Sequence, residues 1–503
     1  MKRIVAIVVL LVAVFNASAQ QSSFIKDSLE NYITQGMKDW NIPGLAVVIV
    51  KDGQVAYMKG FGVKDISTSA PVDENTLFFI ASNTKLFTGT ALANLEYRNK
   101  LSLNDKISKY FPQYRLYEKS TSELVTIRDL LSHRIGTKTF QGDFTFWNSS
   151  LSRREIMNRM RLLKPVAQYR QEYGYCNSCF LTAGEVIPVV SKQPWEVYVY
   201  DSIVIPVGMK NTHLLTNNMA QLQNVAAPYT NIYTGNLQRV PYDRWDNLAP
   251  AASIASNVND LSRWLLFQLD SGRIDGKQVL PWNVLQETRK MNTIVANRGA
   301  GPTHFVGYGL GVFMKDYMGK MVYYHGGGAA GMISNVTFVP EQKLGIAILT
   351  NNDNHGFLGA LQTQILDAYF NVPYVNRSEA ALPVFRKEMQ KQLNEIGTWE
   401  ERVKGSKPLS DLKSYAGEYS NELYGKLVIT AKENKLYLKF FSHNDLTATM
   451  EYMDNGEWLL KYDNVEYGIF ATKFNLSNGK PVSVIIKANP FVEEDPYTFI
   501  KKK

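Results

Sequence analysis

A serine and a lysine stand three residues apart in the stretch FFIASNTKLFTGTALANLEY. The apolar residues of this stretch recur at helical spacing, so we expect a helix that carries Ser82 and Lys85 on one face. A serine hydroxyl becomes a strong nucleophile when a base takes its proton. A lysine buried among apolar side chains can be that base, because burial lowers its pKa. The alternative is a surface S-x-x-K, a spacing that chance produces often.

A tyrosine and an asparagine lie two residues apart in YRQEYGYCNSCFLTAGEVI, just ahead of an apolar helical pattern. On a loop, Tyr175 and Asn177 can point into one cleft. The phenol can transfer a proton, and the carboxamide can orient a substrate amide by hydrogen bonds. The alternative is a capped helix start with a core tyrosine.

A third polar group ends a predicted strand in YYHGGGAAG. After His325, the glycines allow a substrate backbone to lie against the strand edge. A backbone N–H at such an edge can stabilise an oxyanion. The alternative is a flexible loop after a strand.

Together these three motifs, SNTK, YCN and HGG, resemble the serine β-lactamase-related family: class C β-lactamases, DD-peptidases, and related esterases and D-aminopeptidases. Their order and wide spacing match the class C-like branch of that family. The flanking stretches VTIRDLLSHRIG, LAPAASIASNVNDLSRWL and YGLGV also resemble segments that these proteins share. The resemblance covers roughly residues 24–374.

The resemblance implies a catalytic role for three residues. Ser82 attacks a carbonyl and becomes acylated, and Lys85 accepts or relays its proton. Tyr175 acts with Lys85 as general base, then protonates the leaving group and helps to activate the water of deacylation. No metal or other cofactor is expected.

It also implies the substrate-binding residues. Asn177 contacts the substrate amide, and His325 borders the cleft near Tyr175. Gly327 and Gly328 lie on the same strand edge, where the N–H groups of Ser82 and Gly328 form the oxyanion hole. His133 is expected to be structural.

One departure from the family pattern bears on the substrate. His325 stands where many members carry a lysine, and a largely neutral histidine gives less attraction for the carboxylate of a β-lactam. We therefore expect a peptidase or esterase rather than an efficient β-lactamase. The alternative function is a binding or sensor protein that holds peptidoglycan fragments without turnover.

The pattern of strands and helices predicts an α+β fold. Strand patterns within residues 41–62 and 308–353 bracket a helical middle from about residue 103 to 287. This order favours one antiparallel sheet built from both ends of the domain and flanked by helices, with a mostly helical second subdomain. Gly136 and Asn259 are a candidate helix terminator and a candidate helix cap. We predict the hydrolase domain at residues 20–375, a helical linker at 376–408, and a small antiparallel, lipocalin-like barrel of roughly eight strands at 409–503.

The first residues, MKRIVAIVVLLVAVFNASAQ, predict a signal peptide over residues 1–19, with export to the periplasm or the exterior and no stable membrane insertion after cleavage. The alternative is an uncleaved membrane anchor.

The net charge of +9 is scattered, which argues against a nucleic-acid partner. We expect a small-molecule or peptide substrate, with cell-wall fragments among the candidates; the oligomeric state is open. The two cysteines, Cys176 and Cys179, could form a small disulfide after export.

Overall fold

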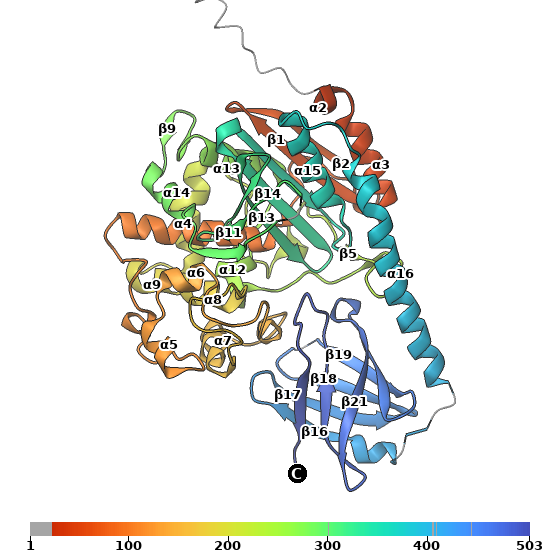
Figure 1. Ribbon diagram of the computed structural model, residues 1–503. Helices are drawn as coiled ribbons and strands as arrows, with labels where there is room; N and C mark the ends of the chain where they lie inside the picture. Colours follow the sequence, from red (N-terminus) through yellow and green to blue (C-terminus); the bar gives the residue numbers. More distant parts are fainter. Residues whose placement is uncertain (1–22, 300, 405–406, 409, 444) are drawn as a thin grey trace, which may run out of the picture.

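The computed structural model describes residues 23–503, except 300, 405, 406, 409 and 444. The predicted signal peptide lies outside the described residues. Figure 1 shows the two parts of the chain, a sheet covered by helices and a separate barrel, joined by the long helix α16. The α+β prediction with an all-β C-terminal barrel is confirmed.

The central sheet has nine antiparallel strands, and its order joins the two ends of the domain. In spatial order, the strands are β10 (Thr293–Ala296), β11 (Val306–Tyr308), β12 (Phe313–Tyr317), β13 (Lys320–Ala329), β14 (Met332–Val339), β15 (Leu344–Thr350), β1 (Gly44–Lys51), β2 (Gln54–Asp65) and β3 (Ala70–Pro71). Strand β1 pairs with β15, with Leu45 opposite Thr350, so residues about 300 positions apart in the sequence are neighbours in the sheet.

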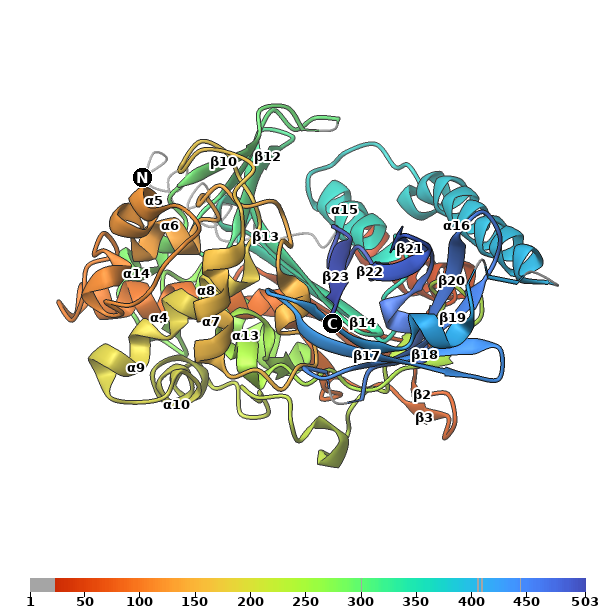
Figure 2. The same ribbon diagram turned by 90° about the horizontal axis from the view of Figure 1, so that it is seen from below.

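Strand β1 is buried on both faces, which explains its continuous apolar run. Its odd residues, such as Val47, belong to a core with the helices α2 (Ser23–Asp27), α3 (Leu29–Asp39) and α15 (Phe357–Tyr369). Its even residues, such as Val48, face the other core, which contains α13 (Val258–Leu269) and α4 (Thr84–Tyr97). The alternation places the sheet between two helical layers (Figures 1 and 2).

A helical subdomain lies beside the sheet. Its helices include α5 (Lys119–Leu124), α6 (Ile127–Leu131), α7 (Arg153–Arg159), α8 (Asn177–Gly184), α9 (Val186–Ser191), α10 (Trp195–Val199), α12 (Ala249–Ala252) and α14 (Trp282–Thr288). Two local predictions were wrong. Helix α6 ends at Leu131, well before Gly136, and α13 is capped by Asn257 rather than Asn259, since the Asn257 side chain accepts from the Asp260 N–H.

Helix α16 (Arg377–Val403) connects the sheet domain to the barrel. Near its start, Trp40 donates from Nε1 to Ser378 Oγ at 2.8 Å. Near its end, Arg402 donates to Glu457 at 2.6 Å, on barrel strand β20. The helix is therefore attached to both parts.

The barrel is closed by eight strands. They are β16 (Gly417–Asn421), β17 (Gly425–Lys432), β18 (Lys435–Phe440), β19 (Thr447–Tyr452), β20 (Glu457–Tyr462), β21 (Ile469–Ser477), β22 (Lys480–Ile486) and β23 (Tyr497–Lys501). Phe144, from the helical subdomain, is fully buried and its ring contacts His443 at 4.1 Å and Tyr497 at 5.7 Å between ring centroids. The barrel is thus docked on the helical subdomain through buried aromatic side chains.

Candidate active site

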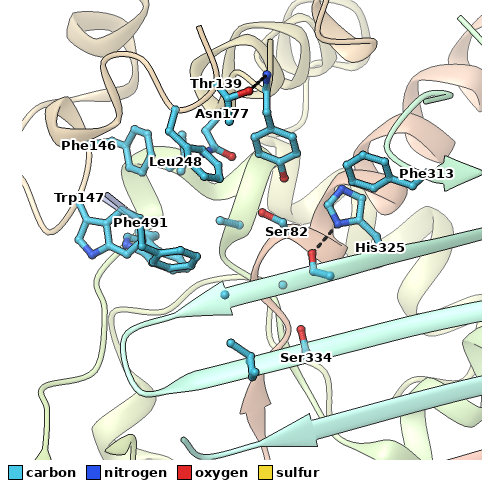
Figure 3. A pocket seen from close by; sticks show the side chains of 18 of the residues that line it. Ser82, Thr139, Phe146, Trp147, Asn177, Leu248, Phe313, His325, Ser334 and Phe491 are labelled. Atoms are coloured by element: carbon cyan, nitrogen blue, oxygen red, sulfur yellow. Dashed lines mark hydrogen bonds between the residues drawn. The ribbon is translucent and has the colours of Figure 1, made fainter. Parts of the chain in front are cut away.

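Ser82 lies in a short 3₁₀ turn, Ala81–Asn83, that leads directly into α4. The residue before it, Ala81, has φ of +45°, a left-handed conformation that costs energy in a residue with a side chain. The turn is held in place because Asn83 Nδ2 donates to Ser334 Oγ at 3.0 Å and Ser334 Oγ donates to the Ile80 carbonyl at 2.9 Å. The strained turn presents the hydroxyl at the base of a cavity (Figure 3).

Lys85 is fully buried one turn after Ser82. Its Nζ lies 2.6 Å from Asn177 Oδ1, 3.0 Å from the Ala251 carbonyl oxygen and 3.0 Å from Ser82 Oγ. Burial lowers its pKa from 10.5 to about 7. A neutral amine has two N–H groups and one lone pair. With the N–H groups donated to the two carbonyl oxygens, the lone pair is left for the hydroxyl hydrogen of Ser82.

Tyr175 lies beside Ser82 in the cavity wall, close enough for the serine hydroxyl to influence the pKa of its phenol. Burial raises the pKa of Tyr175 far above 10, so the phenol is protonated at neutral pH. The Lys85 Nζ lies 4.7 Å from the centre of the tyrosine ring. The ring centroid of His133 lies 4.2 Å from that of Tyr175. The His133 Nδ1 accepts from the Cys176 N–H at 3.0 Å. His133 therefore supports the Tyr175 loop.

Asn177 is the first residue of α8, and both ends of its carboxamide are engaged. Its Oδ1 accepts from Lys85, and its Nδ2 donates to Asp143 Oδ2 at 2.6 Å. Burial and the nearby Glu493 carboxyl raise the pKa of Asp143 well above its usual range. Sequence reasoning missed Asp143 because an acidic residue in the loop stretch QGDFTFW looks like an ordinary turn residue.

His325 lies on β13 and is uncharged. Its Nδ1 donates to the Gly326 carbonyl at 2.5 Å, so its Nε2 accepts from the Tyr308 hydroxyl at 3.1 Å. Burial, followed by the charge of Lys85, lowers its pKa to about 3. The third motif therefore carries no cation near neutral pH.

The glycines after His325 allow two close approaches. A Cβ at Gly327 would lie 2.1 Å from the Ile80 carbonyl oxygen, and a Cβ at Gly328 would lie 2.1 Å from the ring of Phe491. Pairing of β13 with β12 ends at Tyr324. Beyond Tyr324, β13 is paired only with β14, on its other side. This segment of β13 therefore lies in direct contact with the turn that carries Ser82.

The cavity has a volume of about 500 Å³ and contains six of the seven predicted site residues in its wall. These are Ser82, Tyr175, Asn177, His325, Gly327 and Gly328. Lys85 lies buried behind Ser82. The wall also contains aromatic residues that sequence reasoning did not select, among them Trp147, Trp245 and Phe491. Phe491 comes from the barrel, and its motif, NPFVEED, carries no signal that points to a site more than 400 residues away.

The two cysteines are free and buried, so the disulfide that we considered is not formed. Cys179 lies in α8, and Cys176 immediately precedes that helix. No group of His, Cys, Asp and Glu side chains in the described ranges is arranged to hold a metal ion. None of the helices that the structure describes is long and apolar enough to cross a membrane.

The profile of the Beta-lactamase family matches residues 29–370, and that of a domain of unknown function, DUF3471, matches residues 401–501. Protein flp of Staphylococcus aureus (strain MW2) is 28% identical over 331 residues, which is 65% of this chain and 63% of that protein. The chain thus spans less than two thirds of the Flp protein. Unguisins hydrolase ungD of Aspergillus violaceofuscus is 22% identical over 458 residues, covering 84% and 80% of the two chains.

Two solved structures share the fold. The octameric penicillin-binding protein homologue from Pyrococcus abyssi has a TM-score of 0.59 at 21% identity, over 94% of this chain and 99% of that one. The structure of SurE has a TM-score of 0.57 at 17% identity, over 96% and 100%. Both similarities extend through the barrel as well as the sheet domain.

Proposed function

Because the chain belongs to the Beta-lactamase family, we propose that it is a serine hydrolase that forms an acyl-enzyme on Ser82 and cleaves an ester or an amide. The single observation that carries this proposal is the 3.0 Å contact between Ser82 Oγ and the buried amine of Lys85, whose pKa is lowered to about 7. A relative whose name describes it as a hydrolase, ungD, supports the same reaction type.

In the first step, Ser82 Oγ bonds to the substrate carbonyl carbon while its proton passes to Lys85 Nζ. The carbonyl oxygen becomes an oxyanion, for which we propose the N–H groups of Ser82 and Gly328 as donors. When the tetrahedral intermediate collapses, the bond to the leaving group breaks and the Tyr175 phenol protonates that group. The proton held on Lys85 then passes to the Tyr175 phenolate and restores the phenol.

Deacylation reverses these transfers with water in place of the leaving group. Water adds to the acyl carbon and gives one proton to Lys85, the Ser82–acyl bond breaks, and Ser82 takes that proton back from Lys85. Because the Tyr175 phenol has a raised pKa, we assign it the role of proton donor and relay, and Lys85 the role of base.

Asn177 and Asp143 position the base. The Asn177 carboxamide fixes the amine of Lys85 by accepting one of its N–H groups, and Asp143 fixes the carboxamide in turn. One N–H of Asn177 Nδ2 is left for a substrate carbonyl, because Asp143 accepts the other. His325 acts as an uncharged part of the cleft wall.

For the substrate class, we propose an ester or a D-amino-acid peptide rather than a β-lactam turned over efficiently. The neutral His325 supports this choice, since it offers no permanent positive charge to the carboxylate of a β-lactam. Export through the N-terminal signal and access to cell-wall peptides are part of the same proposal.

The test is covalent labelling with a small fluorophosphonate, followed by a substrate panel. Wild-type protein should gain one adduct, on the peptide that contains Ser82, and the Ser82→Ala variant should gain none. A panel of nitrocefin, short-chain nitrophenyl esters and D-alanyl nitroanilides should give turnover of the esters or anilides above that of nitrocefin. Labelling that persists in Ser82→Ala would place the nucleophile elsewhere, and tight muropeptide binding without any turnover would favour the binding protein.

A further inference from the structure

One end of the cavity is walled by aromatic side chains that converge from separate parts of the chain. Phe146 and Trp147 come from the helical subdomain, Trp245 from the loop before α12, and Phe491 from the barrel. Figure 3 shows Phe146, Trp147 and Phe491 together on one side of Ser82, with His325 on the other. We name these four residues the aromatic box.

The rings of the box contact one another. Trp147 lies 5.0 Å from Trp245 and 5.5 Å from Phe491 between ring centroids, both nearly perpendicular, and 6.1 Å from Phe146. These are the separations at which aromatic rings attract through offset and edge-to-face arrangements. A planar ring from a ligand would extend an array that is already formed.

The barrel loop that brings in Phe491 is firmly held. The Phe491 N–H donates to Asn489 Oδ1 at 3.1 Å. Two residues later, Glu493 accepts from the Gly142 N–H at 2.6 Å and from the Tyr424 hydroxyl at 2.8 Å. The Glu493 bonds tie the loop to both the helical subdomain and the barrel. The loop therefore holds Phe491 in a fixed position in the cavity wall.

The cavity offers no counter-ion to a charged substituent. In the described part of the chain, no Asp, Glu, Lys or Arg side chain lines it. Behind the wall, the pKa of the Asp243 carboxyl is raised by burial to about 7, and that of Asp143 is raised as well. Burying an unpaired carboxylate among these rings would weaken binding, because the ion would lose its hydration with no partner to offset the loss.

We propose that the aromatic box binds an uncharged, ring-bearing group of the substrate next to the scissile carbonyl, and that Phe491 of the barrel is a specificity-determining residue. This inference rests on the proposed serine hydrolase function. It gives the barrel a direct part in substrate selection.

Alkylboronic acids test the inference separately from the function. Ser82 Oγ adds to the trigonal boron, the hydroxyl proton passes to Lys85, and no bond to a leaving group breaks, so the inhibition constant reports on one substituent. The probes are ethyl-, 2-phenylethyl-, 2-carboxyethyl- and 2-(trimethylammonio)ethylboronic acid. Binding is measured by competition with fluorophosphonate labelling of Ser82.

The phenyl compound should bind at least about 10-fold tighter than the ethyl compound, from the apolar area that a ring buries. The carboxylate compound should be the weakest. In Phe491→Ala, the phenyl-to-ethyl ratio should fall at least about 5-fold, whereas Phe441→Ala, which removes an exposed ring of the same barrel, should leave the ratio unchanged. In Phe491→Arg, the carboxylate compound should gain affinity relative to the ethyl compound.

The outcomes separate the two proposals. If none of the boronic acids protects Ser82, the hydrolase function itself is in doubt. If all protect Ser82 equally, or the trimethylammonium compound binds tightest as in a cation–π cage, the function stands and the inference is overturned. A phenyl preference that survives Phe491→Ala in folded protein would remove Phe491 as the determinant.

Discussion

The Nζ of Lys85 lies 3.0 Å from the Oγ of Ser82, in a position with no solvent exposure. Burial makes the charged amine unfavourable, and the two carbonyl acceptors orient it when it is neutral. The fold therefore maintains an uncharged base against the nucleophile without any acidic partner in direct contact with the amine.

Replacing Lys85 by arginine should abolish turnover. A guanidinium keeps its proton throughout the accessible pH range, so it cannot accept the serine proton. We expect kcat/KM for an ester substrate to fall by about 10³-fold, within the range for loss of a general base. The matched control is Lys100→Arg, an exposed lysine just beyond α4, which should retain wild-type kinetics. Near-normal activity in Lys85→Arg would contradict the assigned base.

Replacing Tyr175 by phenylalanine should affect amides more than activated esters. The variant keeps the ring contacts with His133 and Lys85 but loses the phenol proton. An amide leaving group needs that proton as its bond breaks, whereas a nitrophenolate leaves without it. We expect a loss of about 10²-fold for a nitroanilide and less than about 10-fold for a nitrophenyl ester. Equal losses on both substrates would argue against proton donation by Tyr175.

Carboxyl groups at the contact between the barrel and the sheet domain should make stability depend on pH. Glu466 of the barrel is buried. The carboxyl groups of Asp243 and of Asp353, which follows β15, lie near it, as do Tyr233 and Tyr467. Burial raises the pKa of each carboxyl, that of Asp243 to about 7. A carboxyl with a raised folded-state pKa binds more protons when folded, so its contribution to stability is complete below the unfolded pKa near 4 and is lost as pH rises through the folded value.

The Glu466→Gln variant isolates this effect. It removes one of the titrating groups, whose pKa is raised by burial, so its melting temperature relative to wild type should rise steadily as the pH is increased from about 4. Glu422→Gln, at an exposed position of the barrel, should show no such trend. A difference between wild type and Glu466→Gln that stays constant over this pH range would refute the assignment.

Removing the ring of Phe144 should loosen the barrel. This side chain is fully buried among His443, Tyr497 and other barrel aromatics. Phe144→Ala should cost about 3 kcal/mol in the free energy of unfolding, as is usual for a large buried ring. Limited proteolysis should then cleave near α16 sooner than in wild type. Tyr117→Ala, an exposed aromatic of the same subdomain, is the control, and equal protease sensitivity in both would count against the docking role.

The sequence was sufficient to predict the sheet and the barrel, because their signals are local. Strand β1 is a continuous apolar run, and the barrel turns at Asn455 and Asn478 have the positive φ that their turn sequences indicate. The contact between Ser82 and Lys85 was also predictable from their spacing, although Ser82 lies in the 3₁₀ turn that leads into α4 rather than in the helix itself.

The rest of the site depends on long-range packing. Asp143 becomes part of the site only because Asn177 and Lys85 are brought against it. Phe491 lines the cavity only because the barrel docks through Phe144. The cap of α13 fell on Asn257 instead of Asn259 because either asparagine satisfies the local rule and tertiary packing chooses between them.

The most direct measurement of the central claim is the pH dependence of the rate at which a fluorophosphonate labels Ser82, followed by intact mass between pH 5 and 9. The neutral amine is the reactive form, so the rate should rise with pH, with a midpoint at about 7, and then level off. A rate that is independent of pH over this range, or an adduct on any residue other than Ser82, would contradict a neutral Lys85 as the base.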